Sequence, residues 1–365
     1  MKVGLVLGAG GIQGGAWLVG GLDALAGETG WDPASAERIV GTSAGSMISA
    51  LLCGGVPPWF MVAHSRGERF DGVVDATGRP AADADRSGGG VFAYDRGALP
   101  IFPGSLGLIG HSLRQPLRHT PAALMAGWAP RGVVSTDSLR KQVRHVVPAG
   151  WAPHPELWVV ACDYATGRRV PFGRASSPTA DLADAVAASC AIPSFYRPVE
   201  IGGRLYVDGG MYSTSNLDVL RGEELDLVIC LNPTSSLHPT RAWNPLERLA
   251  GNFRDASGRR LGNEAKKLRR LGTEVILIQP TGEDLEAMGP NLMSRRSRDR
   301  VIEVARRTVA AQLAEPGIAE LLAELPQGEA ERVRRPDGPP SEWTALVGPQ
   351  NGSGAQVRGS SASRS

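Results

Sequence analysis

The sequence predicts an α/β fold, and three observations near its start carry the prediction. An apolar run at Lys2–Leu7 ends in glycines, as is typical of a buried strand. A glycine-rich loop follows and leads into a helix expected at about Ala16–Ala26. A second strand at Arg38–Val40 runs through a glycine-flanked turn into a helix expected at Met47–Cys53. This repeated order of strand, loop and helix is the beginning of an α/β sheet.

Length and composition bound the class of protein. The 365 residues, 42% hydrophobic and 21% charged, suffice for a large core in one α/β domain or two smaller ones. A net charge of +2 creates no global field toward nucleic acid, so we expect no nucleic-acid partner. The four cysteines are far apart in small or apolar surroundings, which predicts reduced core thiols and no metal site.

The hydropathy pattern bears on location. No uninterrupted apolar run of about 18 residues occurs, so we expect no transmembrane span. The first apolar run meets glycines too early to be the core of a signal peptide. Together with reduced cysteines, these features predict a cytoplasmic protein, and any attraction to a membrane must come from local patches.

The remaining elements are predicted from short apolar runs bounded by turn residues. Strands are expected at Leu157–Cys162, Arg169–Phe172, Val199–Ile201, Leu205–Val207, Leu227–Leu231 and Glu274–Ile278. Helices are expected at Ala180–Ser189, with Thr179 as N-cap, and over Val301–Leu322, with a break at Pro316 and Gly317.

Two segments depart from this pattern. Residues 66–97 lack any apolar period, which predicts a long surface loop. Pro100–Pro130 is more apolar and is expected to form a cap over the functional site. The last part of the chain, 335–365, is rich in Pro, Gly, Ser and Gln, which predicts a disordered tail. We therefore expect one domain over 1–330, with a loop and cap insertion at 66–130.

The pentapeptide Gly41-Thr42-Ser43-Ala44-Gly45 has the G-x-S-x-G pattern of a nucleophile elbow. In an elbow, a sharp turn between strand and helix exposes the serine, and side chains at the flanking glycines would collide with neighbouring elements. The helix N-terminus stabilises negative charge beside the serine. The context favours Ser43 as nucleophile, with Gly41 and Gly45 as elbow glycines. The alternative is a plain βα turn, in which the apex residue would be arbitrary.

The loop after the first strand contains Gly8, Gly10, Gly11 and Gly14. Backbone N–H groups at a helix N-terminus can hold an oxyanion or a phosphate. A dinucleotide site competes with this interpretation, but Gln13 stands where G-x-G-x-x-G has its last glycine, and the second strand does not end in an acid. We interpret the four glycines as an oxyanion hole, where one donor is typically worth roughly 2.7–4 kcal/mol.

A third motif, Asp208-Gly209-Gly210, follows a predicted strand. A carboxylate there can accept the Ser43 proton directly, because a partly dry site and a positioned hydrogen bond strengthen a weak base. The tripeptide alone is a weak signal, since most such sequences are ordinary turns.

Together the three motifs resemble those of the patatin-like phospholipases, which include bacterial serine acyl-hydrolases. That family has a glycine-rich oxyanion loop, then G-x-S-x-G, then a distant D-G-G or D-G-A. This chain has Gly8–Gly14, Gly41–Gly45 and Asp208–Gly210 in that order. Ala188–Pro193 also resembles the family's A-S-x-A-x-P block. The resemblance covers roughly Lys2–Pro233, and more loosely the helices beyond, and implies a three-layer α/β/α sandwich around a mostly parallel sheet.

For function, the resemblance implies a lipid acyl-hydrolase of the phospholipase A, lysophospholipase or esterase type. Ser43 would attack the acyl ester, and Asp208 would take its proton in a catalytic dyad without histidine. The glycine loop would hold the oxyanion, and water would release the fatty acid from the acyl-enzyme. The partner is a lipid or acyl-ester substrate, and no metal or other cofactor is implied. The family usually carries Arg or Lys where Gln13 stands, and this departure bears on substrate choice more than on catalysis.

Other interpretations stay open. A catalytically silent or regulatory protein would keep the pocket for an acyl ligand, and a nucleotide-binding module would use the glycine loop for phosphate. His238 follows Asp208 in the Ser…Asp…His order of α/β-hydrolases, but those folds have several strands before the elbow. His238 lies between Leu237 and Pro239, which is typical of a surface loop, and all six histidines are interpreted as structural or exposed.

Basic residues gather in two later segments. They are Arg259, Arg260, Lys266, Lys267, Arg269 and Arg270 in the first, and Arg295, Arg296, Arg298 and Arg300 in the second. Solvated helix faces explain both clusters. The functional alternative is peripheral contact with anionic lipid, at which Pro100–Pro130 would supply apolar insertion.

Overall fold

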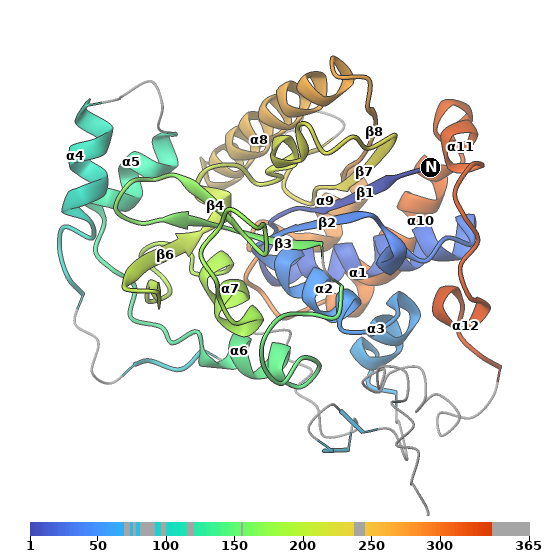
Figure 1. Ribbon diagram of the computed structural model, residues 1–365, viewed down its shortest axis with the longest axis horizontal. Helices are drawn as coiled ribbons and strands as arrows, with labels where there is room; N and C mark the ends of the chain where they lie inside the picture. Colours follow the sequence, from blue (N-terminus) through green and yellow to red (C-terminus); the bar gives the residue numbers. More distant parts are fainter. Residues whose placement is uncertain are drawn as a thin grey trace, which may run out of the picture.

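A central sheet with helices on both faces makes up most of the described chain (Figure 1). The computed structural model describes residues 1–68, 74–75, 78–80, 92–95, 100–114, 120–154, 156–236 and 245–337. His238, most of the loop expected at 66–97 and most of the tail expected at 335–365 lie outside the described residues, so those expectations stay predictions.

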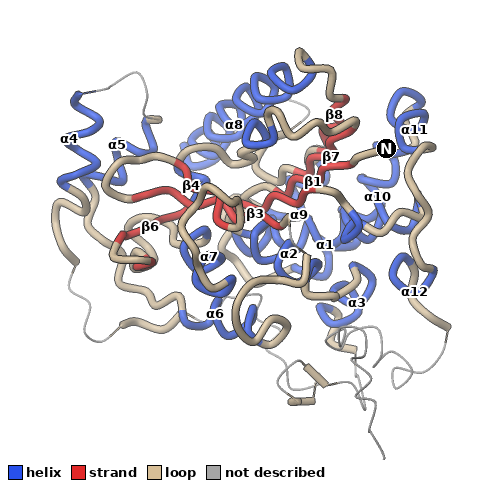
Figure 2. The backbone as a smooth tube through the Cα atoms, in the orientation of Figure 1, coloured by secondary structure: helices blue, strands red, loops and turns tan. Residues whose placement is uncertain are grey.

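Within the described residues the sheet has eight strands in the order β5-β6-β3-β2-β1-β7-β8, and β4 pairs with β3 off this path (Figure 2). They are β1 (Val3–Leu7), β2 (Arg38–Thr42), β3 (Leu157–Asp163), β4 (Arg169–Phe172), β5 (Val199–Ile201), β6 (Arg204–Asp208), β7 (Leu227–Leu231) and β8 (Glu274–Ile278). The run from β3 through β2, β1 and β7 to β8 is parallel, whereas β4, β5 and β6 pair antiparallel. Each strand expected from the sequence is confirmed with small shifts at its ends.

The register of β3 brings two strand ends together. Strand β2 pairs with its first half, up to Thr42 opposite Val160, and β6 pairs with its second half, starting at Asp208 opposite Ala161. Strand β4 overlaps both registers, so it occupies the other edge of β3. Strand β2 is parallel to β3 and β6 is antiparallel. Their carboxyl ends therefore meet head to head on one edge of β3, and this junction positions the site.

Helices form a layer on each side of the sheet. They are α1 (Gly11–Thr29), α2 (Ala44–Cys53), α3 (Pro58–Ser65), α4 (Leu106–Arg114), α5 (Pro121–Trp128), α6 (Asp137–Arg144), α7 (Leu182–Ser189), α8 (Pro245–Arg269), α9 (Gly282–Met288), α10 (Arg298–Leu313), α11 (Pro316–Leu322) and α12 (Ala330–Val333). Helices α1, α2, α7 and α10 lie on one side and α8 on the other (Figure 1). The three-layer α/β/α arrangement predicted from the sequence is confirmed.

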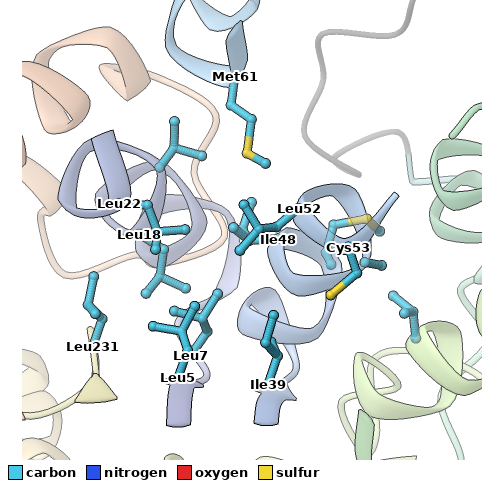
Figure 3. Close-up of a cluster of buried hydrophobic side chains, with 14 of the residues drawn as sticks. Leu5, Leu7, Leu18, Leu22, Ile39, Ile48, Leu52, Cys53, Met61 and Leu231 are labelled. Carbon is cyan, nitrogen blue, oxygen red and sulfur yellow. The ribbon is translucent and has the colours of Figure 1, made fainter. Parts of the chain in front are cut away.

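The core divides between the two faces because successive strand side chains alternate. Leu5 and Leu7 of β1 pack with side chains of α1 and α2 (Figure 3). Val6, between them, packs in a second cluster that contains Leu261 and Leu268 of α8. All five side chains are buried. Apolar residues without interruption in β1 are thus explained by burial on both faces.

Helix α1 begins at Gly11, earlier than the expected start near Ala16. Its glycines suggested a loop, but they allow close packing instead. A Cβ atom at Gly14 would lie 3.1 Å from Pro233 Cγ, and one at Gly20 would lie 2.4 Å from the Ile302 carbonyl oxygen of α10. Tertiary contact outweighs the low helix propensity of glycine here.

Helix α7 begins at Leu182, two residues later than expected, and its cap differs from the prediction. The Asp181 carboxylate accepts the Ala183 N–H, so Asp181 and not Thr179 is the N-cap. Its second oxygen accepts the Gly150 N–H, which ties the cap to the preceding loop. That long-range bond favours Asp181, and local sequence does not reveal it.

The segment expected to form a cap lies elsewhere. Helices α4 and α5 pack against the β3 and β6 end of the sheet through an apolar cluster. Its buried members are Leu108, Ala123, Ala126, Cys162, Tyr164, Val207 and Met211. Cys162 and Val207 point to this face because they alternate with residues on the α7 face. The apolar residues of Pro100–Pro130 that suggested a cap thus partly fill a satellite core.

No single described helix has the length and apolar composition of a membrane span, and α2 and α3 meet both criteria only as a pair bent by 117°. The described part of the chain holds no group of three metal-ligating side chains. All four cysteines are free and buried, and burial raises the pKa of each thiol.

Candidate active site

The junction of β2 and β6 brings Ser43 and Asp208 into contact. Ser43 Oγ donates a hydrogen bond of 2.7 Å to Asp208 Oδ2, although 165 positions separate the two residues in sequence. Both residues are buried, with 5% and 6% of their surface exposed. Ser43 follows the last residue of β2, and Asp208 is the last residue of β6. A hydroxyl and a carboxylate in this arrangement can transfer a proton directly.

Ser43 adopts a strained backbone conformation, with φ 53° and ψ −119°. Positive φ is unfavourable for residues with a side chain, and such strain is found mainly at functional sites. The residue occupies the N-cap position of α2, so the first turn of that helix points its N–H groups toward the site. The turn matches the geometry expected of a nucleophile elbow.

The elbow glycines explain how the strain is held. A Cβ atom at Gly45 would lie 2.0 Å from the Leu7 carbonyl oxygen, and one at Gly41 would lie 2.5 Å from Ser46 Cα. Real Cβ atoms do not approach backbone so closely, so α2 can lie against β1 and β2 only if both positions are glycine.

We expect Gly45→Ala to destabilise the protein by several kcal/mol, or to prevent folding, because the new methyl group would collide with the backbone of β1. Thermal unfolding and soluble yield measure this. Gly27→Ala is the matched control, because a Cβ at this α1 position meets nothing within 4 Å and alanine favours helix by about 1 kcal/mol. Equal stability of the two variants would contradict the packing account.

Ser189, the last residue of α7, supports the elbow from the side. Its hydroxyl accepts the Ser43 backbone N–H at 2.8 Å and donates to the Val160 carbonyl oxygen at 2.6 Å. The side chain is fully buried. Sequence reasoning gave Ser189 no role. The available signal was a serine at the end of an alanine-rich helix, within the block Ala188–Pro193.

Asn216 connects the segments that carry Ser43 and Asp208. Its Nδ2 donates to Ser213 O at 2.6 Å and to Thr42 Oγ1 at 3.1 Å, with a longer contact of 3.4 Å to Gly209 O. Thr42 precedes Ser43 and Gly209 follows Asp208, so one buried amide links the ends of β2 and β6. Asn216 itself has a left-handed backbone, which asparagine tolerates. Nothing in its surrounding sequence singled it out.

The environment of Asp208 shifts its proton affinity. Burial disfavours the charged carboxylate and raises its pKa from 3.8 to about 6, against the lowering effect of hydrogen bonds from Ser43 and Gly210. The second of these is a 2.7 Å bond from the Gly210 N–H to Asp208 Oδ1. A carboxylate with this pKa is a stronger base than an exposed one and is still ionised at pH 7.

The four glycines assigned to an oxyanion hole differ in what their N–H groups do. Gly8 N–H donates to the Leu231 carbonyl oxygen of β7, and Gly14 N–H donates to Gly10 O at the start of α1. The N–H groups of Gly10 and Gly11 have no acceptor among the described residues. Gly11 also lines the cavity that contains Ser43. Of the four glycines, Gly10 and Gly11 thus keep N–H donors without an acceptor in the described part of the chain.

The Gln13 side chain does not line the cavity that contains Ser43. Its side chain is buried, and Nε2 donates to the carbonyl oxygens of Ser294 and Arg296 at 3.0 and 2.5 Å. Its backbone N–H donates to Leu292 O at 3.0 Å. Three bonds thus fasten the segment before α10 to the first turn of α1. Gln13, which stands where the family usually has Arg or Lys, therefore holds two segments of the chain together.

A partly open cavity of about 230 Å³ lies beside Ser43. Most of its lining is apolar and comes from α1, α2 and α3, together with α6 and the loop after α7. His64 and His145 also line it, and His145 Nδ1 bonds the Asp75 carboxylate, so the expectation that all histidines are structural or exposed stays a prediction. None of the described residues of 100–130 lines the cavity, whereas Val74 and Asp75 do. The cavity can take an acyl chain with its carbonyl at the serine.

Comparison with known proteins adds two findings. The family described as patatin-like phospholipase matches residues 5–221, which is more than half of the chain. Among solved structures, VipD from Legionella pneumophila is similar to this chain at 14% identity, over 86% of this chain and 66% of that one, with a TM-score of 0.36. The chain thus spans just under two thirds of the length of VipD. The family match includes Ser43 and Asp208.

Proposed function

Because the chain belongs to the patatin-like phospholipase family, we propose that it is a lipid acyl-hydrolase in which Ser43 is the nucleophile and Asp208 its base. The observation that carries the proposal is the 2.7 Å hydrogen bond between the two side chains at a strained strand-to-helix turn. The adjacent apolar cavity supports an acyl substrate. Under this proposal the protein is a serine hydrolase acting on carboxylic esters of lipids.

The first half of the reaction forms an acyl-enzyme. Ser43 Oγ attacks the ester carbonyl carbon while its proton passes to Asp208 Oδ2. Negative charge develops on the carbonyl oxygen, and the free N–H groups of Gly10 and Gly11 stabilise it together with the α2 N-terminus. The tetrahedral intermediate collapses, its bond to the alcohol oxygen breaks, and Asp208 returns the proton to the leaving alcohol.

The second half releases the fatty acid. Asp208 accepts a proton from water, which attacks the acyl-enzyme carbonyl, and then returns that proton to Ser43 Oγ. In this mechanism Asn216 and Ser189 touch no reacting atom. They act by position, since Asn216 links Thr42 to Gly209 and Ser189 holds the Ser43 backbone.

A panel of esters tests the proposed activity. We expect release of fatty acid from phospholipid or lysophospholipid and hydrolysis of p-nitrophenyl esters, with the rate depending on acyl length because the chain enters an apolar cavity. A fluorophosphonate probe should label the wild-type protein. Absence of both hydrolysis and labelling would favour a catalytically silent acyl-binding protein, which a fatty-acid-induced rise in Tm would then identify.

The pKa of Asp208 predicts the pH dependence of catalysis. The base must be ionised, so kcat/KM should fall as pH drops through about 6 and should be nearly constant from pH 7 to 8. Initial rates with a soluble p-nitrophenyl ester, which does not ionise in this range, measure the profile. An acid limb near pH 4 would indicate an exposed, unperturbed carboxylate, and would contradict the buried dyad.

A further inference from the structure

An exposed apolar surface lies on α4, α5 and the residues just before them. Half of the large apolar side chains that are exposed in the described part of the chain come from this short segment. They are Ile101, Phe102, Leu106, Leu113, Met125 and Trp128, each between 50% and 74% exposed. Figure 1 shows α4 and α5 projecting beyond the β6 end of the sheet, away from the rest of the molecule. Such a concentration indicates a contact surface.

Each of the two helices is apolar on two faces. In α4, Leu108 packs inward, whereas Leu106 and Leu113 point outward seven residues apart, on one face of the helix. In α5, Met125 and Trp128 are outward neighbours three residues apart. The inward faces of both helices are filled by the satellite core. Folding therefore explains only half of the apolar residues, and the outward half is exposed in the described part of the chain.

The charge of the same segment is one-sided. Residues 96–136 contain no Asp or Glu, although the whole chain has 37 of them. The ionisable residues of this stretch are Arg96, His111, Arg114, Arg118, His119 and Arg131. Arg114, at the end of α4, is exposed. Basic residues beside apolar and aromatic side chains are the combination that binds anionic bilayers, because the apolar groups enter the acyl region and the cations meet the head groups.

We propose that the outward face of α4 and α5 docks the protein onto an anionic lipid bilayer. This inference rests on the proposed function in one respect, because a lipid substrate resides in a bilayer. The surface is also anchored close to the catalytic base. Thr120, the N-cap of α5, donates its hydroxyl to Met211 O, three residues beyond Asp208, and Met211 packs in the core beneath the helices. Docking would thus hold the dyad near the membrane surface.

The test is vesicle co-sedimentation of the full chain. We expect binding to vesicles of phosphatidylglycerol and phosphatidylcholine, weaker binding to phosphatidylcholine alone, and loss of binding at high salt. Leu113→Asp and Met125→Asp should each lower the partition coefficient roughly tenfold or more, because each removes an inserted side chain. Both residues are more than 70% exposed, so Tm should not change.

Leu271→Asp is the matched control. Leu271 is an exposed leucine beside Arg269 and Arg270 at the end of α8, outside the proposed surface. Leu271→Asp should leave vesicle binding unchanged. Equal losses of binding in Leu113→Asp, Met125→Asp and Leu271→Asp would overturn the proposal. So would a dimer in gel filtration that Leu113→Asp converts to a monomer, because the face would then join two copies.

Two further measurements separate this inference from the proposed function. Vesicle binding should persist in Ser43→Ala, which needs no catalysis to bind. Hydrolysis of a soluble p-nitrophenyl ester should be the same in Leu113→Asp and wild type, whereas hydrolysis of vesicle lipid should fall with binding. An inactive protein that still binds vesicles through α4 and α5 would refute the enzyme proposal alone. An active protein that binds vesicles equally well with both substitutions would refute the docking proposal alone.

Discussion

Ser43→Ala is expected to lower kcat/KM for ester hydrolysis by roughly 10⁴- to 10⁶-fold, to the level left by binding and the oxyanion donors. The substitution removes the atom that forms the acyl-enzyme, and neighbouring groups cannot replace it. Fold and cavity should persist, because the lost contact is a single hydrogen bond to Asp208. The comparison requires initial rates with a p-nitrophenyl ester and a thermal melt for each protein.

Ser49→Ala is the matched control for this substitution. Ser49 is a fully buried serine of α2, the helix whose N-cap is Ser43. Its hydroxyl has no hydrogen-bond partner among the described residues. It should keep wild-type kcat and equal or higher stability. If Ser43→Ala retained a substantial fraction of wild-type activity, the covalent mechanism would be wrong.

Asp208→Asn should lower kcat/KM by roughly 10⁴-fold, since the amide keeps the shape of the carboxylate but cannot accept the serine proton. Its oxygen can still accept the Gly210 N–H while its nitrogen donates to Ser43, so the site should remain assembled. Initial rates on the same ester measure the loss. Retained activity would point to another base, and His145 on the cavity wall would be the first candidate.

Asp208→Asn should also be more stable than wild type at neutral pH. The Asp208 pKa is about 6 in the folded protein against 3.8 for an unperturbed aspartate, so the folded state binds more protons between these values. The contribution of Asp208 to wild-type stability therefore falls as pH rises from about 4 to 6 and stays lowered above that range. Asparagine has no such dependence, so the Tm advantage of Asp208→Asn should be full at pH 7 and vanish below about pH 4.

Asp163→Asn provides the matched control for both effects. Asp163 is a buried aspartate at the end of β3, but it accepts bonds from Ala165 N, Thr166 N and Arg204 and makes no contact with Ser43. Its replacement should reduce stability and leave kcat nearly unchanged. If Asp163→Asn and Asp208→Asn lowered kcat equally, loss of buried charge, and not loss of the base, would govern activity.

Much of the sheet could be predicted from sequence because its strands carry continuous apolar runs. Burial on both faces leaves no room for polar residues in β1 or β7, so their limits are visible. The limits of helices were harder to predict where tertiary packing overrides helix propensity. Helix α1 is glycine-rich because Gly14 packs closely on Pro233 and Gly20 on α10, and a local signal for those contacts does not exist.

Some residues of the site could likewise be predicted from the sequence, and others could not. Ser43 and Asp208 stood out because each lies in a motif whose chemistry requires that residue type. Their contact depends on β2 and β6 meeting on one edge of β3, which is a property of strand pairing across more than a hundred residues. Ser189 and Asn216 hold backbone groups and the Thr42 hydroxyl of distant segments, so only the folded chain shows what they bind.

The sequence alone could not decide whether Pro100–Pro130 forms a cap, for a physical reason. The apolar content of Pro100–Pro130 fits a lid, a satellite core or a membrane surface equally well. Distinguishing them requires knowing which side chains face inward, and helical spacing in α4 and α5 gives two apolar faces with no indication of which one is buried. The structure assigns one face to the core and leaves the other exposed.

Labelling with a fluorophosphonate, followed by peptide mapping, tests the central claim most directly. The probe reacts only with a serine whose hydroxyl is activated by a neighbouring base. The account predicts a single adduct on Ser43, lost in Ser43→Ala and formed far more slowly in Asp208→Asn. An adduct on a different residue, or equal labelling rates in wild type and Asp208→Asn, would contradict it.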